Sequence, residues 1–318
     1  MTYVGQSAPA RSEPDAPRAT GSSRVKDVAA AYLGLTKPRV IELLLLTTVP
    51  VMFFAARGVP DLGLVVATVI GGSLSAGSAS ALNCVYDRDI DEQMRRTRRR
   101  ALPRHIVSTG SALVFGVTLG VLATVILAVW VNPLSAVLSL VAECFYLFVC
   151  TMLLKRRTTQ NIVWGGLAGC FPALIGWTAV TDQLAWAPVV LFAVVFFWTP
   201  PHTWALALRY REDYAGVDVP MLPVVAPAET VGRQIVLYSW VMVVTSLLLW
   251  PVARTGSVYP VAALALGVVF LVQAHRMWAR TRGTEDLSRI RPMVLFHASN
   301  LYLSLLFVAV ALDPLLTR

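Results

Sequence analysis

Charged residues are scarce in this chain of 318 residues, where Asp, Glu, Lys and Arg together make up only 14%. Soluble domains contain about 25% charged residues, so the composition excludes a soluble globular enzyme. Cysteine is also scarce: the four residues form no C-x-x-C pair, which favours buried free thiols over a disulfide framework or a zinc site. Polar residues are too few for a disordered chain, because 56% of the residues are hydrophobic.

The chain is rich in long apolar runs. Runs of about twenty residues suffice to cross a bilayer as helices, and they recur along most of the length. The sequence therefore predicts an all-α polytopic membrane protein, with nine spans at residues 39–57, 62–86, 111–131, 134–154, 161–180, 185–208, 234–253, 257–275 and 293–312. The short links 131–133 and 181–183 predict tight antiparallel hairpins. Residues 1–28 are predicted to be a disordered tail and residues 29–318 the membrane domain.

The basic residues predict the orientation of these spans. If the amino terminus and the connections after every second span share one side, all but three of the 27 Lys and Arg residues gather there. Only Arg57, Arg254 and Arg318 fall on the other side. The positive-inside rule then places the amino terminus in the cytoplasm and the carboxyl terminus outside the cell membrane. The net charge of +9 is thus explained by topology and does not indicate nucleic-acid binding.

An acidic motif follows the second predicted span. At about 100° per residue, Asn83, Asp87 and Asp91 fall on one helical face, and Asp89 points roughly opposite. Oxygen ligands at this spacing suit Mg²⁺, which proteins hold with one or two carboxylates and the phosphates of a substrate. The alternative is a solvated acidic helix end that is balanced by the arginines after it.

Basic residues lie next to this motif and after the fourth span. Arginine side chains match phosphate oxygens in a bidentate way, and positive loops also contact anionic lipid. The residues concerned are Arg95, Arg96, Arg98, Arg99, Arg100 and Arg104 after the motif, and Lys155, Arg156 and Arg157 at the end of the fourth span. They could bind a diphosphate, and the alternative is that they contact lipid and anchor the helix.

The connection after the sixth span repeats the acidic and basic pattern. It contains Arg209, Glu212 and Asp213, and it leaves the membrane on the same predicted side as the first motif. Two such loops predict one cytoplasmic pocket between related halves of the chain. A lipid diphosphate fits a site that joins acids, arginines and membrane.

Three polar residues interrupt apolar runs. His202 follows Pro200 and Pro201 in the sixth span, and helices tolerate such prolines where protein or a cavity satisfies the freed backbone groups. We expect its ring to face the cavity, where it could ligate iron; a structural hydrogen bond is the alternative. Glu42 and Glu143 are expected to face the bundle interior.

These residues give the chain a resemblance to the UbiA superfamily of intramembrane prenyltransferases, over about residues 34–312. The matching segments are Leu35-Thr36-Lys37-Pro38-Arg39, Asn83 to Asp91 with Met94-Arg95-Arg96-Thr97, Lys155-Arg156-Arg157-Thr158 with Asn161-Ile162-Val163, Thr199-Pro200-Pro201-His202, and Asp213-Tyr214 with Pro220-Met221-Leu222-Pro223.

The resemblance implies nine transmembrane helices around a central cavity open to the cytoplasmic side. Within the superfamily, the chain is most similar to members that transfer a farnesyl group from farnesyl diphosphate to the 2-vinyl group of haem b. The resemblance implies that Asp87, Asp91 and Asp213 hold the Mg²⁺ cofactor and carry catalysis. It also implies that the substrates are bound by Asn83, Arg96, Arg100, Lys155, Arg156, His202 and Arg209. Further partners implied are membrane lipid and, downstream, haem A synthase or terminal oxidase assembly factors.

The chain departs from the superfamily at its second motif, which commonly has two acids four residues apart. Here Arg209 lies four residues before Asp213, so a complete second metal site is not expected from this pattern. Two other functions remain as alternatives. Prenylation of an aromatic quinone precursor would use the same acids without His202. An ion-coupled transporter would bind ions near the bilayer midplane, whereas these acids lie at a predicted membrane edge.

Overall fold

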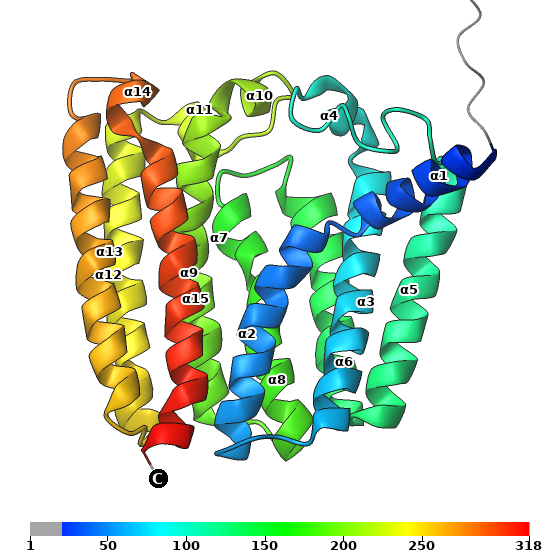
Figure 1. Cartoon of the computed structure of the whole chain (residues 1–318). Helices are drawn as coiled ribbons and strands as arrows, with labels where there is room; N and C mark the ends of the chain where they lie inside the picture. Colours follow the sequence, from blue (N-terminus) through cyan, green and yellow to red (C-terminus); the bar gives the residue numbers. More distant parts are fainter. Residues whose placement is uncertain (1–20, 318) are drawn as a thin grey trace, which may run out of the picture.

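The computed structural model describes residues 21–317, and these form a bundle of helices (Figure 1). The elements in chain order are α1 Gly21–Leu35, α2 Pro38–Ala56, α3 Leu62–Tyr86, α4 Arg88–Gln93, α5 Thr109–Trp130, α6 Pro133–Cys144, η1 Phe145–Leu154, α7 Asn161–Gly165, η2 Gly166–Cys170, α8 Phe171–Thr181, α9 Trp186–Arg209, α10 Arg211–Ala215, α11 Leu222–Val225, α12 Ala228–Ala253, α13 Val258–Thr281, α14 Leu287–Ile290 and α15 Pro292–Leu316.

The nine predicted spans are confirmed. Within the described residues, nine helices or continuous helical segments are long and apolar enough to cross a membrane. Two residues separate α5 from α6 and four separate α8 from α9, so both predicted hairpins are present. Two spans were predicted too short. Helix α12 begins at Ala228, six residues before the predicted start, and α13 continues to Thr281, six residues beyond the predicted end. Both extensions carry polar and basic residues, which lowered the hydropathy of the helix ends.

The predicted tail is corrected in its last eight residues. Residues 1–20 lie outside the described part of the chain, but residues 21–28 belong to α1. The run Val28 to Ala31 is rich in alanine, the best helix former, and Ala31 and Leu35 are buried against α3, α5 and the segment between α4 and α5. The apolar side of α1 therefore packs on the bundle, and a helix is stabilised where composition alone suggested disorder.

Two of the spans are irregular beside the centre of the bundle. The fourth span changes from α-helix to π-helix at Phe145, and the fifth contains a 3₁₀ segment between α7 and α8. The second irregularity coincides with Gly165, Gly166 and Gly169, followed by Pro172 at the start of α8. Glycine lowers helix stability and proline cannot donate to the preceding turn, so the α-helical pattern is interrupted there.

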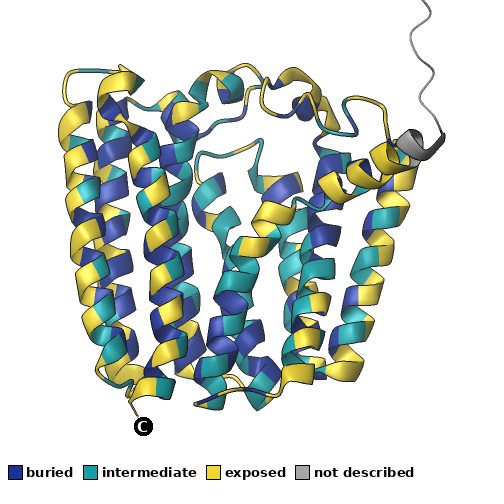
Figure 2. Ribbon diagram, viewed as in Figure 1, coloured by how far each residue is buried: buried dark blue, intermediate teal, exposed yellow. Residues whose placement is uncertain are grey.

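The helices form two packed groups with α2, α7 and α8 between them. On one side α9, α12, α13 and α15 share a core that includes Leu191, Ile235, Phe270 and Phe307. On the other side α3 packs on α5 and α6. The outward faces of the spans carry many exposed apolar side chains (Figure 2), as expected of surfaces in contact with lipid. We use "charged end" for the end of the bundle that carries α4 and α10.

Candidate active site

A cavity of about 600 Å³ lies between the two groups of helices and extends from the charged end into the bundle. Asn83, Asp91 and Lys155 line it at the charged end, and Thr68 lines it on α3 at the far end. Beside the cavity α8 packs closely on α2, where a Cβ at Gly176 would collide with the carbonyl oxygen of Thr48. The structure thus provides a deep pocket inside the membrane-spanning bundle.

The first acidic motif lies at the mouth of this cavity. Although α3 ends at Tyr86, the backbone N–H of Asp87 donates to Asn83 O and that of Asp91 donates to Asp87 O, each at 2.9 Å. The helical spacing therefore continues, and Asn83 Nδ2 donates to Asp87 Oδ2 at 2.7 Å. All three residues are buried. The prediction that they share one helical face is confirmed.

Each member of the motif has a basic partner. Lys155 forms an ion pair with Asp87, Arg100 Nη1 contacts Asp91 Oδ2 at 2.7 Å, and Lys37 Nζ donates to Asn83 Oδ1 at 2.8 Å. Burial lowers the pKa of Lys37. These cations offset the repulsion between the two carboxylates.

Asp89 points away from the motif, as its spacing predicts. Its two carboxylate oxygens accept from Arg156 Nη1 and Nη2, both at 2.8 Å, and this contact lowers the pKa of Asp89. Arg156 Nη2 also lies 3.6 Å from Asp87 Oδ1, and its guanidinium stacks over the ring of Tyr86. Arg156 therefore connects the two faces of the motif, although its side chain does not line the cavity.

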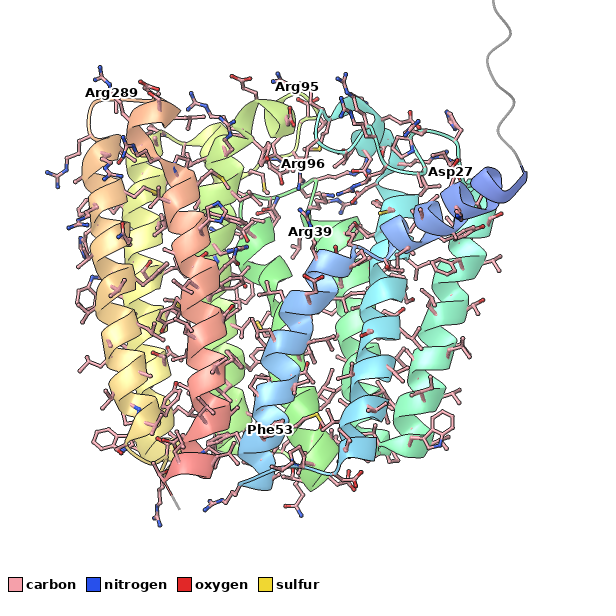
Figure 3. All side chains as sticks on the ribbon, in the orientation of Figure 1. Asp27, Arg39, Phe53, Arg95, Arg96 and Arg289 are labelled. Atoms are coloured by element: carbon pink, nitrogen blue, oxygen red, sulfur yellow. The ribbon has the colours of Figure 1, made fainter. Side chains whose placement is uncertain are left out.

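The second loop contacts the first, as expected of two loops around one pocket. Arg95 donates from Nε to Asp213 Oδ1 at 3.1 Å and from Nη2 to Glu212 Oε2 at 2.9 Å. Arg96 lines the cavity together with Tyr214. Arg95 and Arg96 lie at the charged end, opposite Phe53 (Figure 3).

Asp213 itself does not join the first motif. Among residues 21–317, no cluster of three or more His, Cys, Asp or Glu side chains could hold a metal ion, so the three candidate metal ligands do not converge on one point. Arg209 is the last residue of α9; it is exposed and does not line the cavity. Its predicted role in substrate binding therefore stays a prediction, at a position outside the cavity lining.

The expected orientation of His202 is also corrected. Its ring does not line the cavity; it packs between Trp198, with ring centroids 4.1 Å apart, and Phe296, at 4.6 Å. His202 Nδ1 and Ser299 Oγ are hydrogen bonded at 2.8 Å. Pro200 and Pro201 remain inside α9, and the contacts of His202 join this helix to α15. The hydrogen bond between helices is the alternative that the sequence left open.

The donor set of the first motif fits a divalent cation. Asp87 Oδ1 is buried and has no hydrogen-bond partner, and Asp91 lies one turn further with one carboxylate oxygen bound to Arg100. Buried carboxylate oxygens are normally hydrogen bonded, so an orphaned one is suited to a cation. Asp87 does not itself line the cavity, whereas its neighbours in the motif, Asn83 and Asp91, do. Oxygen donors of this type match Mg²⁺.

Two features of the cavity were not assigned from the sequence. Lys37 has a left-handed backbone, with φ 52°, immediately before Pro38, and this turn directs its ammonium group to Asn83. Glu143 lines the cavity and is hydrogen bonded to Ser75 and Ser78 on α3. The position of Lys37 beside a proline at the start of a span could have indicated its role. Glu143 was predicted to face the interior, but nothing in the spacing of the serines in the sequence identified Ser75 and Ser78 as its partners.

Comparison with known proteins agrees with this architecture. The model of the UbiA prenyltransferase family matches residues 44–300. The protoheme IX farnesyltransferase of Nocardioides sp. is 79% identical over 316 residues, which cover 99% of each chain. That of Cutibacterium acnes is 58% identical over 291 residues, covering 92% of this chain and 86% of the relative.

Solved structures share the fold at low identity. A digeranylgeranylglyceryl phosphate synthase has a TM-score of 0.73 at 13% identity, with 91% of this chain and 99% of the other covered. A UbiA homologue from Archaeoglobus fulgidus bound to GPP and Mg²⁺ has a TM-score of 0.64 at 15% identity, with 88% and 99% covered. From the family match and the identity to these relatives, the chain belongs to the UbiA prenyltransferase family.

Proposed function

We propose that this protein transfers the farnesyl group of farnesyl diphosphate to the 2-vinyl group of haem b, giving haem O and diphosphate. The observation that carries the proposal is the set of buried acids and bases at the mouth of an apolar cavity, with Asp87 and Asp91 beside Lys155 and Arg100. The names of the relatives, protoheme IX farnesyltransferase, support the choice of acceptor.

The diphosphate would bind at the first motif. Asp87 and Asp91 would hold Mg²⁺, which when bound neutralises the negative charge that develops on the leaving diphosphate. Lys155 and Arg100 now neutralise these carboxylates, and they would turn to phosphate oxygens once the cation occupies the acids. Lys37 and Arg96 line the same mouth and would add positive charge. Asp213 would act from the second loop by positioning Arg95, to which it is hydrogen bonded.

The cavity would hold the farnesyl chain. Its wall on α2 and α8 is mainly apolar, with Ile41, Leu44 and Ile175 among the lining residues and two threonines, Thr47 and Thr48, beside them. This wall would keep bulk water from the allylic cation that forms when the C1–O bond breaks. The terminal vinyl carbon of haem b then bonds to C1, and water adds to the inner vinyl carbon to give the hydroxyl group.

The charged end would face the cytoplasm. The distribution of Lys and Arg supports this orientation, with the amino terminus inside and the carboxyl terminus outside a cell membrane. Farnesyl diphosphate would then enter from the cytoplasm and haem b from the membrane region. The product would pass to proteins that use haem O, such as haem A synthase or terminal oxidase assembly factors.

Incubation of purified protein with farnesyl diphosphate, Mg²⁺ and haem b tests the proposal. We expect a haem product heavier by one farnesyl group and one water, identified by mass spectrometry, and no product after removal of divalent metal. A parallel reaction with an aromatic quinone precursor addresses the alternative acceptor. Prenylation of that aromatic ring, with haem b left unchanged, would refute the proposed acceptor.

A further inference from the structure

A chain of hydroxyl groups surrounds the carboxyl group of Glu143 inside the bundle. Ser139 Oγ donates to Ser75 Oγ at 2.9 Å, and Ser75 Oγ donates to Glu143 Oε2 at 3.2 Å. Glu143 Oε1 is hydrogen bonded to Ser78 Oγ, and Ser78 Oγ also contacts the carbonyl oxygen of Gly116 at 2.8 Å. Three helices, α3, α5 and α6, thus contribute to one network, which we name the serine relay.

The serine relay contains four hydrogen bonds but only three hydroxyl protons. A serine hydroxyl carries one proton, and a carbonyl oxygen only accepts. Ser78 Oγ lies within hydrogen-bond distance of two acceptors, Gly116 O and Glu143 Oε1. A proton on the carboxyl group of Glu143 would supply the missing donor. The geometry therefore favours a neutral carboxylic acid at Glu143.

Glu143 is accessible from the cavity, and the wall around it is polar. Ser75, Ser139 and Glu143 all line the cavity, where they form a polar wall on α3 and α6. Ser80 and Asn83 line it nearer the charged end. With a rise of about 1.5 Å per residue, Ser80 lies about 4.5 Å and Ser75 about 12 Å below Asn83 along α3. Polar groups therefore follow the cavity from the diphosphate region to the relay.

A farnesyl chain alone does not account for this polar wall, since an apolar chain makes no hydrogen bonds. A buried water needs two to four polar partners and enough room, and this wall offers both. An ionisable residue inside a membrane also points to a functional role. We propose that Glu143 and the serine relay hold the reactant water that becomes the hydroxyl group of the product. This inference rests on the proposed function.

The neutral state of Glu143 suits this role chemically. After C1 has bonded to the terminal vinyl carbon and diphosphate has left with the bonding electron pair, the positive charge is on the inner vinyl carbon. Oxygen of water donates an electron pair to that carbon, and the proton that water loses passes to the released diphosphate. An ionised carboxylate would compete with water for the cation and form an ester. A neutral carboxylic acid is a much weaker nucleophile, but it still accepts and donates hydrogen bonds.

The test compares Glu143→Leu with Glu143→Gln, because glutamine keeps one donor and one acceptor. Without positioned water, the cation loses a proton and gives an alkene product in place of the hydroxyl product. We expect Glu143→Leu to raise the ratio of alkene to hydroxyl product roughly fivefold to tenfold, the factor that corresponds to one lost hydrogen bond. Glu143→Gln is expected to keep the ratio of the unmutated protein. Both ratios are measured by mass spectrometry of the farnesylated porphyrins.

Glu42→Leu is the matched control. Glu42 is also an acid within a span, but the expectation that it faces the bundle interior is wrong, because the residue is exposed and does not line the cavity. Its product ratio is expected to stay unchanged. If Glu143→Leu does not fold, Ser75→Ala removes the donor to Oε2 and is expected to shift the ratio in the same direction. Infrared spectroscopy of the unmutated protein at neutral pH should also show a protonated carboxyl band that is absent from Glu143→Gln.

The outcomes separate the inference from the proposed function. An unchanged product ratio in Glu143→Leu or, if that variant does not fold, in Ser75→Ala overturns the role in water binding. A Glu143→Gln variant as impaired as Glu143→Leu overturns the neutral state, as does the absence of the infrared band. If the unmutated protein makes no farnesylated porphyrin, the proposed function itself fails.

Discussion

Replacement of Asp87 by asparagine tests the role of the first motif most directly. The substitution removes the negative charge with little change of size, at a side chain that is only 1% exposed. If Asp87 holds the cation that stabilises the leaving diphosphate, its loss should raise the barrier by about 4 kcal/mol, or roughly a thousandfold in turnover. Replacement of Asp87 or Asp91 by alanine should abolish turnover in the same way.

Asp89→Asn is the matched control, two residues away. The Asp89 side chain is 55% exposed and pairs with Arg156. Exposed ion pairs contribute about 0.2–1 kcal/mol, so at most a roughly fivefold loss is expected. Diphosphate release by detergent-purified protein at several Mg²⁺ concentrations measures both variants. Equal losses in the two variants, or full activity of Asp87→Asn at normal expression, would refute the assignment.

Three further predictions concern the ends of the chain, α9 and the cavity mouth. A phosphatase fused after Arg318 should be active outside the cytoplasm, and activity of a cytoplasmic reporter there would refute the predicted orientation. His202→Ala should lower the thermal stability of the protein, because the ring packs on Trp198 and is hydrogen bonded to Ser299. The Soret spectrum and the affinity for haem should stay unchanged, and a loss of haem affinity would instead show that His202 binds haem. Because burial lowers the pKa of Lys37, its positive charge should disappear at a lower pH than that of an exposed lysine, so kcat/KM should fall on the alkaline side. Lys37→Arg should abolish that decline, because arginine keeps its charge at high pH. If Lys37→Arg and the unmutated protein have the same pH profile of kcat/KM, the role of the Lys37 charge is contradicted.

The number of spans and the face of the first motif were predictable, because both depend on local periodicity. Apolar runs define the spans, and the spacing of Asn83, Asp87 and Asp91 places them on one side of a helix whatever lies around them. The hydrogen-bond and ion-pair partners of these residues could not be predicted from local spacing. Lys37 lies 46 residues before Asn83 along the chain, and only the packed bundle brings the two together.

The errors share a physical origin in tertiary packing. Helix α1 forms because the bundle buries Ala31 and Leu35, and composition does not record that surface. The orientation of His202 depends on the rotation of α9, which prolines at two positions do not specify, and on Ser299 in a distant helix. Arg95 and Asp213 are 118 positions apart in the chain. The sequence therefore indicated two related loops, but it could not predict the ion pair between them.

Arg95 also pairs with Glu212, and the exposure of this second ion pair has a consequence for experiments with this protein. The Arg95 side chain is 67% exposed and that of Glu212 80%, so dissolved ions reach both. At physiological ionic strength, charges in water are screened beyond about 8 Å, and added salt shortens this range. Arg100 and Asp91 are better protected, because the carboxylate is only 6% exposed. Added salt is therefore expected to weaken the ion pair of Arg95 with Glu212 before it disturbs the buried acids, so kinetic data on this protein should be compared at one salt concentration.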